Sequence, residues 1–204
     1  MDILIYDELD SRMALDFSAA LNQAYYDRSH NNHNIPYSYI SSNSLQSELT
    51  QQNRFALIYF DNCIIAGGLF LFIEKSQYAK VCKISHLFTS PSYQGKGIGR
   101  QLLLFAEEVA QSHHCSYMQL NVGHIVTPAI SLYKKLGYQP LKIYACEPGT
   151  FYFIRMIKSL NPYHYSEWKR RATLCLSKIK FIFLFNSDST PRFYQKILLR
   201  IFRK

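Results

Sequence analysis

Residues 87–103 read LFTSPSYQGKGIGRQLL, an apolar run that ends at Ser90-Pro91 and is followed by three closely spaced glycines. Glycine lets the backbone turn tightly and pass close to a ligand. The apolar spacing that follows predicts a helix, and the free N–H groups and dipole of a helix N-terminus attract an anion. Lys96 and Arg100 add positive charge beside this turn. The stretch therefore predicts a strand-to-helix turn that holds a diphosphate.

The helix after the turn and the next helix along the chain show apolar residues at helical spacing. The first is expected to bury Ile98, Leu102, Phe105, Ala106 and Val109. Thr127-Pro128 predicts the start of the second helix, with Thr127 as its N-cap, and Gly137 lies where a C-terminal cap belongs. One face of this second helix is expected to carry Ala129, Leu132, Tyr133 and Leu136.

The remaining elements follow from apolar alternation and periodicity. A polar, aromatic stretch at residues 27–40 has no period and is predicted to be a loop. Alternation of strands and helices in this order predicts an α/β sheet with helices on both faces and a ligand site where a strand feeds a helix. Strands are predicted at 3–6, 55–60, 64–74, 81–89, 117–122, 138–144 and 150–157, and helices at about 10–26 and at 44–52.

The glycine spacing excludes two other phosphate-binding motifs. It does not match the G-x-x-x-x-G-K-[ST] pattern of P-loop proteins. It also lacks the G-x-G-x-x-G pattern with an acidic residue about twenty positions later, so a dinucleotide-binding fold has little support. A lone glycine triplet would more often be a turn that binds nothing, so the assignment depends on the rest of the sequence.

Two motifs together resemble the GNAT N-acyltransferase family. The acetyl-CoA loop of that family is an apolar strand, a proline and [RQ]-x-x-G-x-[GA] opening a helix, and Gln94, Gly97 and Gly99 occupy its fixed positions. Residues 129–138, AISLYKKLGY, resemble the second cofactor motif, A-x-x-L-Y-x-x-L-G-[FY]. Because both motifs occur in the family's order and separation, the chain is identified as a member over roughly residues 3–157.

This resemblance implies a mixed, mostly antiparallel sheet and a transferase that uses acetyl-CoA as co-substrate. The implied acceptor is a primary amine, most often of a small molecule; a protein N-terminus or lysine is the next class. The strands at 81–89 and 117–122 should splay apart around pantetheine, and no metal is implied. The implied cofactor-binding residues are Leu87, Phe88, Thr89, Gln94, Gly95, Lys96, Gly97, Ile98, Gly99, Arg100, Thr127 and Ala129.

The resemblance also implies catalytic roles, and one of them is clear. Tyr133 matches the family's tyrosine that protonates the leaving thiolate, although its periodicity alone would favour a core residue. Thr127 stands near the place where the family often has a cofactor-binding asparagine. Because this chain lacks that asparagine, the resemblance does not fix its rate of acetyl transfer or its acceptor class.

The general base is less clear from the sequence. Ser85 and Asn121 match two positions at which the GNAT family frequently has its base, and neither side chain takes a proton from an ammonium at neutral pH. His86, Glu74 and His124 remain candidates. We assign His86 as the base, and the alternative is that it is a buried neutral histidine. Strand alternation predicts that His86 faces away from Ser85. A chain of ordered water could also carry the proton.

The acceptor itself cannot be named from the predicted loop at 27–40. Its tyrosines, asparagines and histidines suit a polar, sugar-like or amino-acid-like acceptor, and equally an ordinary surface loop. His30 and His33 are close in sequence, but no third ligand accompanies them, so a metal site is rejected. A non-catalytic CoA-binding or tethering protein is the alternative of a different class, because the usual carboxylate base is missing.

Charge divides the chain into a near-neutral body and a basic tail. Residues 160–204 hold 10 of the 23 Lys and Arg but 2 of the 14 Asp and Glu. We therefore predict a GNAT domain at 1–158 and a basic, amphipathic helical extension at 159–204. The apolar face of that extension predicts packing on the body or on a second copy as a homodimer, with peripheral contact to an anionic membrane as the alternative. No nucleic-acid-binding motif is present.

Composition fits a globular cytoplasmic protein. Apolar residues make up 48% and charged residues 18%, which excludes a disordered chain. The five cysteines form no C-x-x-C pair, which argues against a disulfide scaffold and a zinc ribbon. The N-terminal residues lack the pattern of a signal peptide.

Overall fold

The computed structural model describes residues 2–31, 38–75, 79–147 and 151–160. The chain divides into two units, Met1–Pro162 and Tyr163–Lys204. The second unit lies outside the described residues, as does the predicted basic helix within it. The domain boundary at 158/159 therefore stays a prediction.

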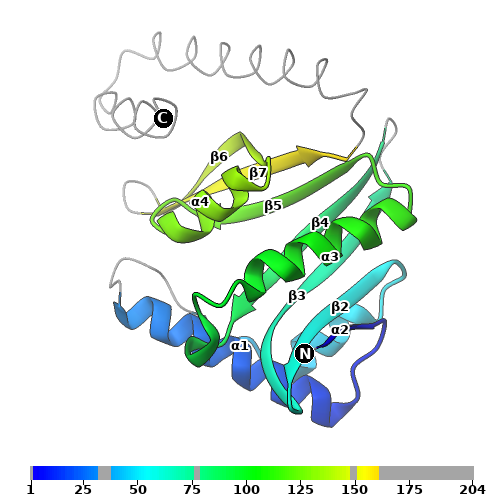
Figure 1. Cartoon of the computed structure of the whole chain (residues 1–204), viewed down its shortest axis with the longest axis vertical. Coiled ribbons are helices and arrows are strands. Elements are labelled where there is room, and N and C mark those ends of the chain that lie inside the picture. Colours follow the sequence, from blue (N-terminus) through cyan, green and yellow to red (C-terminus); the bar gives the residue numbers. More distant parts are fainter. Residues whose placement is uncertain (1, 32–37, 76–78, 148–150, 161–204) are drawn as a thin grey trace, which may run out of the picture. The chain divides into compact units, whose positions relative to one another are not determined.

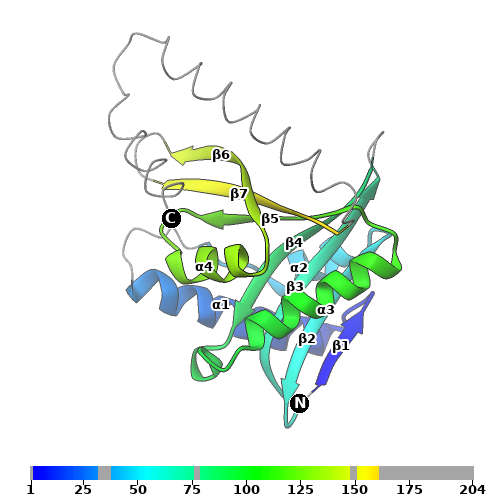
Figure 2. The ribbon, with the colours of Figure 1, turned by 45° about the horizontal axis from the view of Figure 1, so that its top comes forward.

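The first unit is built on one seven-stranded sheet in the order β1-β2-β3-β4-β5-β7-β6 (Figures 1 and 2). β4 and β5 pair in parallel, and the other neighbouring pairs are antiparallel. This confirms the mixed, mostly antiparallel sheet and the predicted order of elements. The strands are β1 (Asp2–Tyr6), β2 (Arg54–Asp61), β3 (Ile64–Lys75), β4 (Lys80–Thr89), β5 (Tyr117–Gly123), β6 (Gln139–Glu147) and β7 (Phe151–Ser159).

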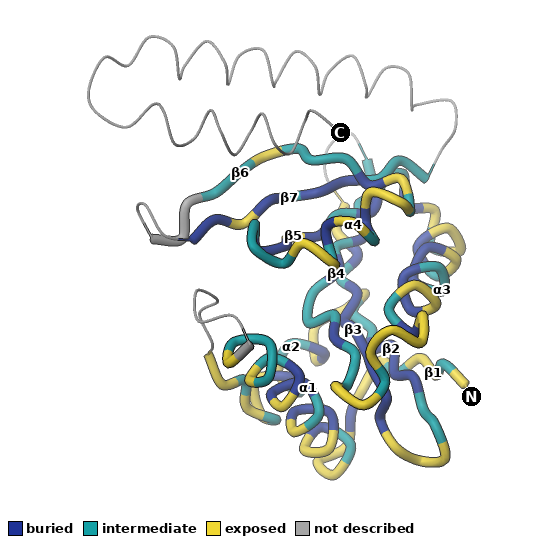
Figure 3. Tube along the Cα trace, turned by 60° about the vertical axis from the view of Figure 1, so that its left-hand side comes forward, coloured by how far each residue is buried: buried dark blue, intermediate teal, exposed yellow. Residues whose placement is uncertain are grey.

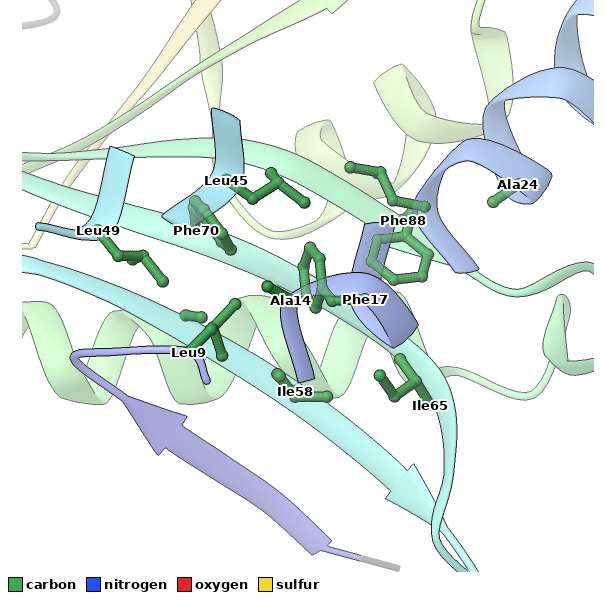
Figure 4. Packing of buried hydrophobic residues seen from close by; sticks show 12 residues of the cluster. Leu9, Ala14, Phe17, Ala24, Leu45, Leu49, Ile58, Ile65, Phe70 and Phe88 are labelled. Carbon is green, nitrogen blue, oxygen red and sulfur yellow. The ribbon is translucent and has the colours of Figure 1, made fainter. Parts of the chain in front are cut away.

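Helices cover both faces of the sheet, as predicted (Figure 3). On one face, Phe17 of α1 (Ser11–Asn31) and Leu45 of α2 (Ser42–Leu49) join a buried cluster with Phe70 and Phe88 of the sheet (Figure 4). On the other face, α3 (Ile98–Ser112) approaches Gly67 of β3 so closely that an added Cβ would lie 3.1 Å from Ile98. The N-terminal part of α3 also lies against α4 (Thr127–Lys135).

The first helix is longer than predicted. It begins where expected, with the Asp10 carboxylate accepting a hydrogen bond of 2.7 Å from the Met13 N–H. It continues to Asn31, so the prediction of a loop over residues 27–31 is wrong. Contacts four residues apart prolong it: the Gln23 amide donates to Asp27 over 2.8 Å, and the Tyr26 and His30 rings lie 3.9 Å apart. These polar pairs leave no apolar period in the sequence.

Two details of the later helices also differ from prediction. The N-cap of α4 is Val126 without a side-chain hydrogen bond, so Thr127 is already helical and Pro128 occupies the first turn. The buried face of α3 includes Leu103, Glu107 and Ala110, whereas Phe105 and Val109 are only half-buried. Glu107 is buried because Lys158 of β7 reaches it over 2.6 Å, a contact that helical periodicity does not reveal.

Candidate active site

The sheet opens between its two parallel strands, and we call this gap the β4–β5 opening. Pairing runs from Val81–Tyr117 to Ile84–Leu120 and then stops, although β4 continues to Thr89 and β5 to Gly123. On its other side β4 stays paired with β3 as far as Thr89. The backbone groups of residues 85–89 that face β5 therefore have no partner in that strand. The splay expected from the family resemblance is present.

A bulge in β4 begins where the opening begins. The register with β3 passes from Phe70–Ser85 to Gly68–Phe88, so Leu69 stands opposite two residues. One of these is His86, whose φ of 53° lies in the left-handed region that residues other than glycine seldom adopt. Bulges bend a strand and increase its twist. The local sequence thus turns β4 away from β5 at His86.

The bulge also redirects the His86 side chain. Its Nε2 lies 3.1 and 3.3 Å from the two carboxylate oxygens of Glu48 in α2, and its ring stands edge-on to Phe70 at 5.4 Å. Ser85 is in register with Phe70 and so shares that face. The prediction that His86 faces away from Ser85 is therefore wrong, because the extra residue breaks strand alternation. Glu48, which the sequence did not single out, becomes the partner of the candidate base.

The other candidate bases have structural partners. Glu74 forms an ion pair with Lys83 over 2.5 Å. His124 accepts a hydrogen bond from the Tyr152 N–H over 3.1 Å at Nδ1, and its ring packs against Phe151. Both side chains are thus engaged in holding strands together, which leaves His86 as the base candidate at the opening.

Two polar side chains at the opening are not ionisable bases, but each has a definite environment. The Ser85 hydroxyl is buried and has no hydrogen-bond partner among the described residues. The Asn121 side-chain oxygen accepts a hydrogen bond of 3.3 Å from Nε of Arg155. A buried unpartnered hydroxyl is uncommon in folded proteins, so Ser85 is available to bond a ligand.

Tyr133 lies in α4 and is 6% exposed. Burial raises the pKa of Tyr133, nearby Tyr25 raises it further, and Arg28 partly offsets both. The phenol is therefore protonated at neutral pH and able to donate. Its hydroxyl makes no hydrogen bond within the part of the chain that the structure describes. Tyr133 thus has the burial of a core residue together with a proton donor that no described residue accepts.

The glycine turn before α3 has the geometry of an anion site, and we call residues 95–100 the anion cradle. Gly95 and Gly97 have φ angles of 78° and 81°, and an added Cβ at either position would meet nothing within 4 Å. The N–H groups of the cradle donate no hydrogen bond to the described backbone. Gly97 is the N-cap of α3, without a side-chain bond, and buried Ile98 anchors the first turn. Free amides at a helix N-terminus suit a phosphate.

The remaining cofactor candidates surround this cradle and the opening. Phe88 is buried against Phe17 at 5.1 Å, so only its backbone faces the opening. Thr89 lies beside Gly99, with its hydroxyl 3.6 Å from the position a Cβ would take there. Thr127 is exposed and Ala129 half-buried at the start of α4. Lys96 lies over the Tyr93 ring at 4.7 Å and, like Arg100, is exposed.

These features define an α/β domain with an anion cradle beside an opened parallel strand pair. A sequence profile described as the acetyltransferase (GNAT) family matches residues 16–138. The chain belongs to this family. The match includes the anion cradle, His86, Tyr133 and α2.

Comparison with individual acetyltransferases supports the assignment to this family. The chain is 32% identical over 79 residues to a thialysine N-epsilon-acetyltransferase of Bos taurus, covering 39% of this chain and 46% of that protein. It is 29% identical over 69 residues to a streptothricin acetyltransferase of Streptomyces lavendulae, covering 34% and 36%. The chain thus matches less than half the length of these relatives. An aminoglycoside 6′-N-acetyltransferase solved with coenzyme A shares the fold at 17% identity, with a TM-score of 0.62 over 79% of this chain and 98% of that one.

The described residues contain neither a candidate metal site nor a membrane-spanning helix. No group of three or more His, Cys, Asp or Glu side chains gathers there in a way that would hold a metal ion. None of the described helices is long and apolar enough to span a bilayer.

Proposed function

We propose that the protein transfers an acetyl group from acetyl-CoA to the primary amine of a small molecule. The observation that carries this proposal is the β4–β5 opening, where β4 parts from β5 at the His86 bulge and leads on to the anion cradle. Buried Tyr133 lies in α4, the helix that follows β5 in the chain. The two curated relatives are named for acetylation of thialysine and streptothricin. The aminoglycoside acetyltransferase of similar fold binds coenzyme A.

The chain offers groups that fit each part of acetyl-CoA. The free N–H groups of the anion cradle would hold the pyrophosphate, aided by the charges of Lys96 and Arg100. Backbone groups of residues 87–89 that face the opening would bond the pantetheine amides. One of their N–H groups would polarise the thioester carbonyl. The bound co-substrate supplies an activated acetyl group, and the remaining chemistry belongs to the side chains.

In the proposed reaction, His86 accepts a proton from the acceptor ammonium while the Glu48 carboxylate fixes the orientation of its ring. The amine nitrogen uses its lone pair to form a bond to the acetyl carbon, and the carbon–sulfur bond breaks with its electron pair remaining on sulfur. Tyr133 donates its proton to that sulfur, the nitrogen gives up its second proton to restore the Tyr133 phenol, and His86 releases the ammonium proton to solvent. The products are an amide and the free thiol of CoA.

The pair formed by His86 and Glu48 favours this proposal over a CoA-binding protein without activity. Ser85 and Asn121 cannot supply a base, whereas a histidine beside a carboxylate can. The backbone of the bulge directs the His86 ring to Glu48, and strained backbone of this kind is common at functional sites. Acetylation of a protein N-terminus or of a lysine side chain would follow the same chemistry. An assay with different amines therefore has to decide which acceptor the protein uses.

The test is release of free thiol from acetyl-CoA with a panel of amines and short peptides. We expect turnover by the wild type and a loss of about 10²- to 10⁴-fold in kcat for His86→Asn. His114→Asn is the matched control, because His114 also has a positive φ of 57° and is exposed in a turn. Asparagine tolerates that conformation at both positions. Binding of acetyl-CoA without thiol release on any acceptor would instead support the tethering function.

A further inference from the structure

We propose that the acceptor amine carries an anionic group, a carboxylate or phosphate, and that Arg155 and Lys142 bind it on one face of β5, β7 and β6. This inference rests on the proposed acetyltransferase function and specifies its substrate class. The two cations and Asn121 form what we call the cationic row. Pairing places Asn121 of β5 opposite Arg155 of β7, and Arg155 opposite Lys142 of β6.

The cationic row lies on the same face of the sheet as His86. Residues paired in register share a face, and register pairs connect Phe72 to Lys83, Lys83 to Gln119 and Gln119 to Ile157. Alternation from Gln119 brings Asn121, and with it Arg155, to this face. Phe72 packs against the cluster that contains residues of α1 and α2, which is also the side of Glu48 and His86.

The row also lies level with the start of the β4–β5 opening. Ile84 is opposite Leu120, the last pair before the strands part, and Asn121 follows directly. Neighbouring strands are ~4.8 Å apart, so Arg155 stands roughly 10 Å or more from β4 across the sheet. An amine at His86 and an acidic group at Arg155 therefore belong to one extended small molecule.

Both cations lie against one aromatic ring. The Arg155 guanidinium carbon is 4.6 Å and the Lys142 ammonium 4.9 Å from the centre of the Tyr144 ring. Nε of Arg155 donates to Asn121, which fixes the plane of the guanidinium. Two like charges that share a ring repel one another, and an anion between them would relieve this repulsion. A held guanidinium also presents its terminal N–H groups as a fork suited to a carboxylate or phosphate.

Two lysines of the sheet have acidic partners, whereas Arg155 and Lys142 have none among the described residues. Lys83 is paired with Glu74 over 2.5 Å and Lys158 with Glu107 over 2.6 Å. Among the described residues, no carboxylate forms an ion pair with Arg155 or Lys142. Arg155 is half-buried and Lys142 exposed. The positive charge at this position therefore remains available to a ligand.

The experiment compares acceptors that differ only in the anionic group, using the full chain and thiol release. The pairs are γ-aminobutyrate with butylamine, ε-aminocaproate with hexylamine, and O-phosphoethanolamine with ethanolamine. We expect kcat/KM for the anionic member of at least one pair to exceed that of its neutral partner by about 10-fold or more. The pair that shows the largest ratio identifies a carboxylate or a phosphate as the bound group.

Arg155→Met tests the assignment to the cationic row. This substitution should lower the ratio of kcat/KM for the anionic acceptor to kcat/KM for its neutral partner by roughly 10- to 100-fold, which is the effect of losing a charged hydrogen bond. Lys142→Met should lower it less, because its side chain is exposed and screened. Arg54→Met is the matched control: Arg54 also stacks on an aromatic ring, at 4.5 Å from the centre of Phe72, but it lies in β2 and should leave the ratio unchanged.

Three outcomes would overturn the inference. The first is equal kcat/KM for the anionic and neutral acceptor in every pair, and the second is activity on peptides alone. The third is an unchanged ratio of anionic to neutral kcat/KM in an Arg155→Met protein that still gives the wild-type thermal shift with acetyl-CoA. If Arg155→Met does not fold, the wild-type ratios and Lys142→Met still decide. Failure of the proposed function looks different, because no amine would then release thiol at all.

Discussion

The two sides of the β4–β5 opening are built from different parts of the chain. The cofactor side is backbone: glycines with positive φ and amide groups at the start of α3. The proposed acceptor side consists of side chains: His86 with Glu48, and Arg155 with Tyr144. A backbone site depends on local conformation and recognises what all acetyl-CoA molecules share. A side-chain site changes with single substitutions, so we expect acceptor choice to vary while the cofactor side stays constant.

Gly97→Val should have the largest effect, because it alters the backbone site itself. A φ of 81° is strained for a β-branched residue, and the new side chain would project into the open space above the cradle. We expect loss of the acetyl-CoA thermal shift, corresponding to roughly a 100-fold or greater loss of affinity, with only a small decrease in the melting temperature of the free protein. Lys96→Met, which changes only a side chain, should cost a few-fold. Equal losses for both variants would contradict a cradle made of backbone.

Tyr133→Phe should have the next largest effect, on turnover and not on binding. Loss of one general acid typically costs 10²–10⁴-fold, and we expect the low end because a thiolate is a good leaving group. The matched control is Tyr138→Phe, since Tyr138 is also buried, has a 6.0 Å ring contact with Tyr133 and has no hydrogen-bond partner for its hydroxyl among the described residues. Steady-state kinetics with acetyl-CoA separate the two. Similar kcat values in both variants would make Tyr133 a core residue only.

Glu48→Gln should have a smaller effect than either. Glu48 touches His86 and not the reacting atoms in our proposal, so it is a positioning residue. We expect kcat to fall about 10-fold, with little change in KM for acetyl-CoA and partial recovery in Glu48→Asp. A fall in thermal stability with normal kcat would instead assign Glu48 a structural role. Such a result would weaken the view that the acceptor side is built from paired side chains.

The glycine turn of the proposed cofactor side was predictable from the sequence because its signals are local. Three glycines and the following helix lie within a few residues, and a turn needs no distant partner to be recognised. The acceptor side was not predictable, because its pairs join positions far apart: Glu48 and His86 are 38 residues apart, and Asn121 and Arg155 are 34. The bulge that brings His86 to the face of α2 leaves no mark in the alternation of β4. The pairing of residues across neighbouring strands brings these side chains together, and no sequence motif marks that pairing.

The smallest expected effect concerns alkaline stability and depends on two buried tyrosines in contact, Tyr133 and Tyr138. Burial raises the pKa of both Tyr133 and Tyr138 above their ordinary value of about 10. Above that pH the unfolded chain ionises these phenols while the folded chain keeps them neutral, so the free energy of unfolding falls as pH rises. Below it both states are neutral, and this contribution is constant. We therefore expect Tyr138→Phe to lose less stability than wild type between pH ~9 and ~11. Denaturant midpoints at the two pH values measure this, and parallel losses in both proteins would show that Tyr138 ionises as readily in the folded state as in the unfolded chain.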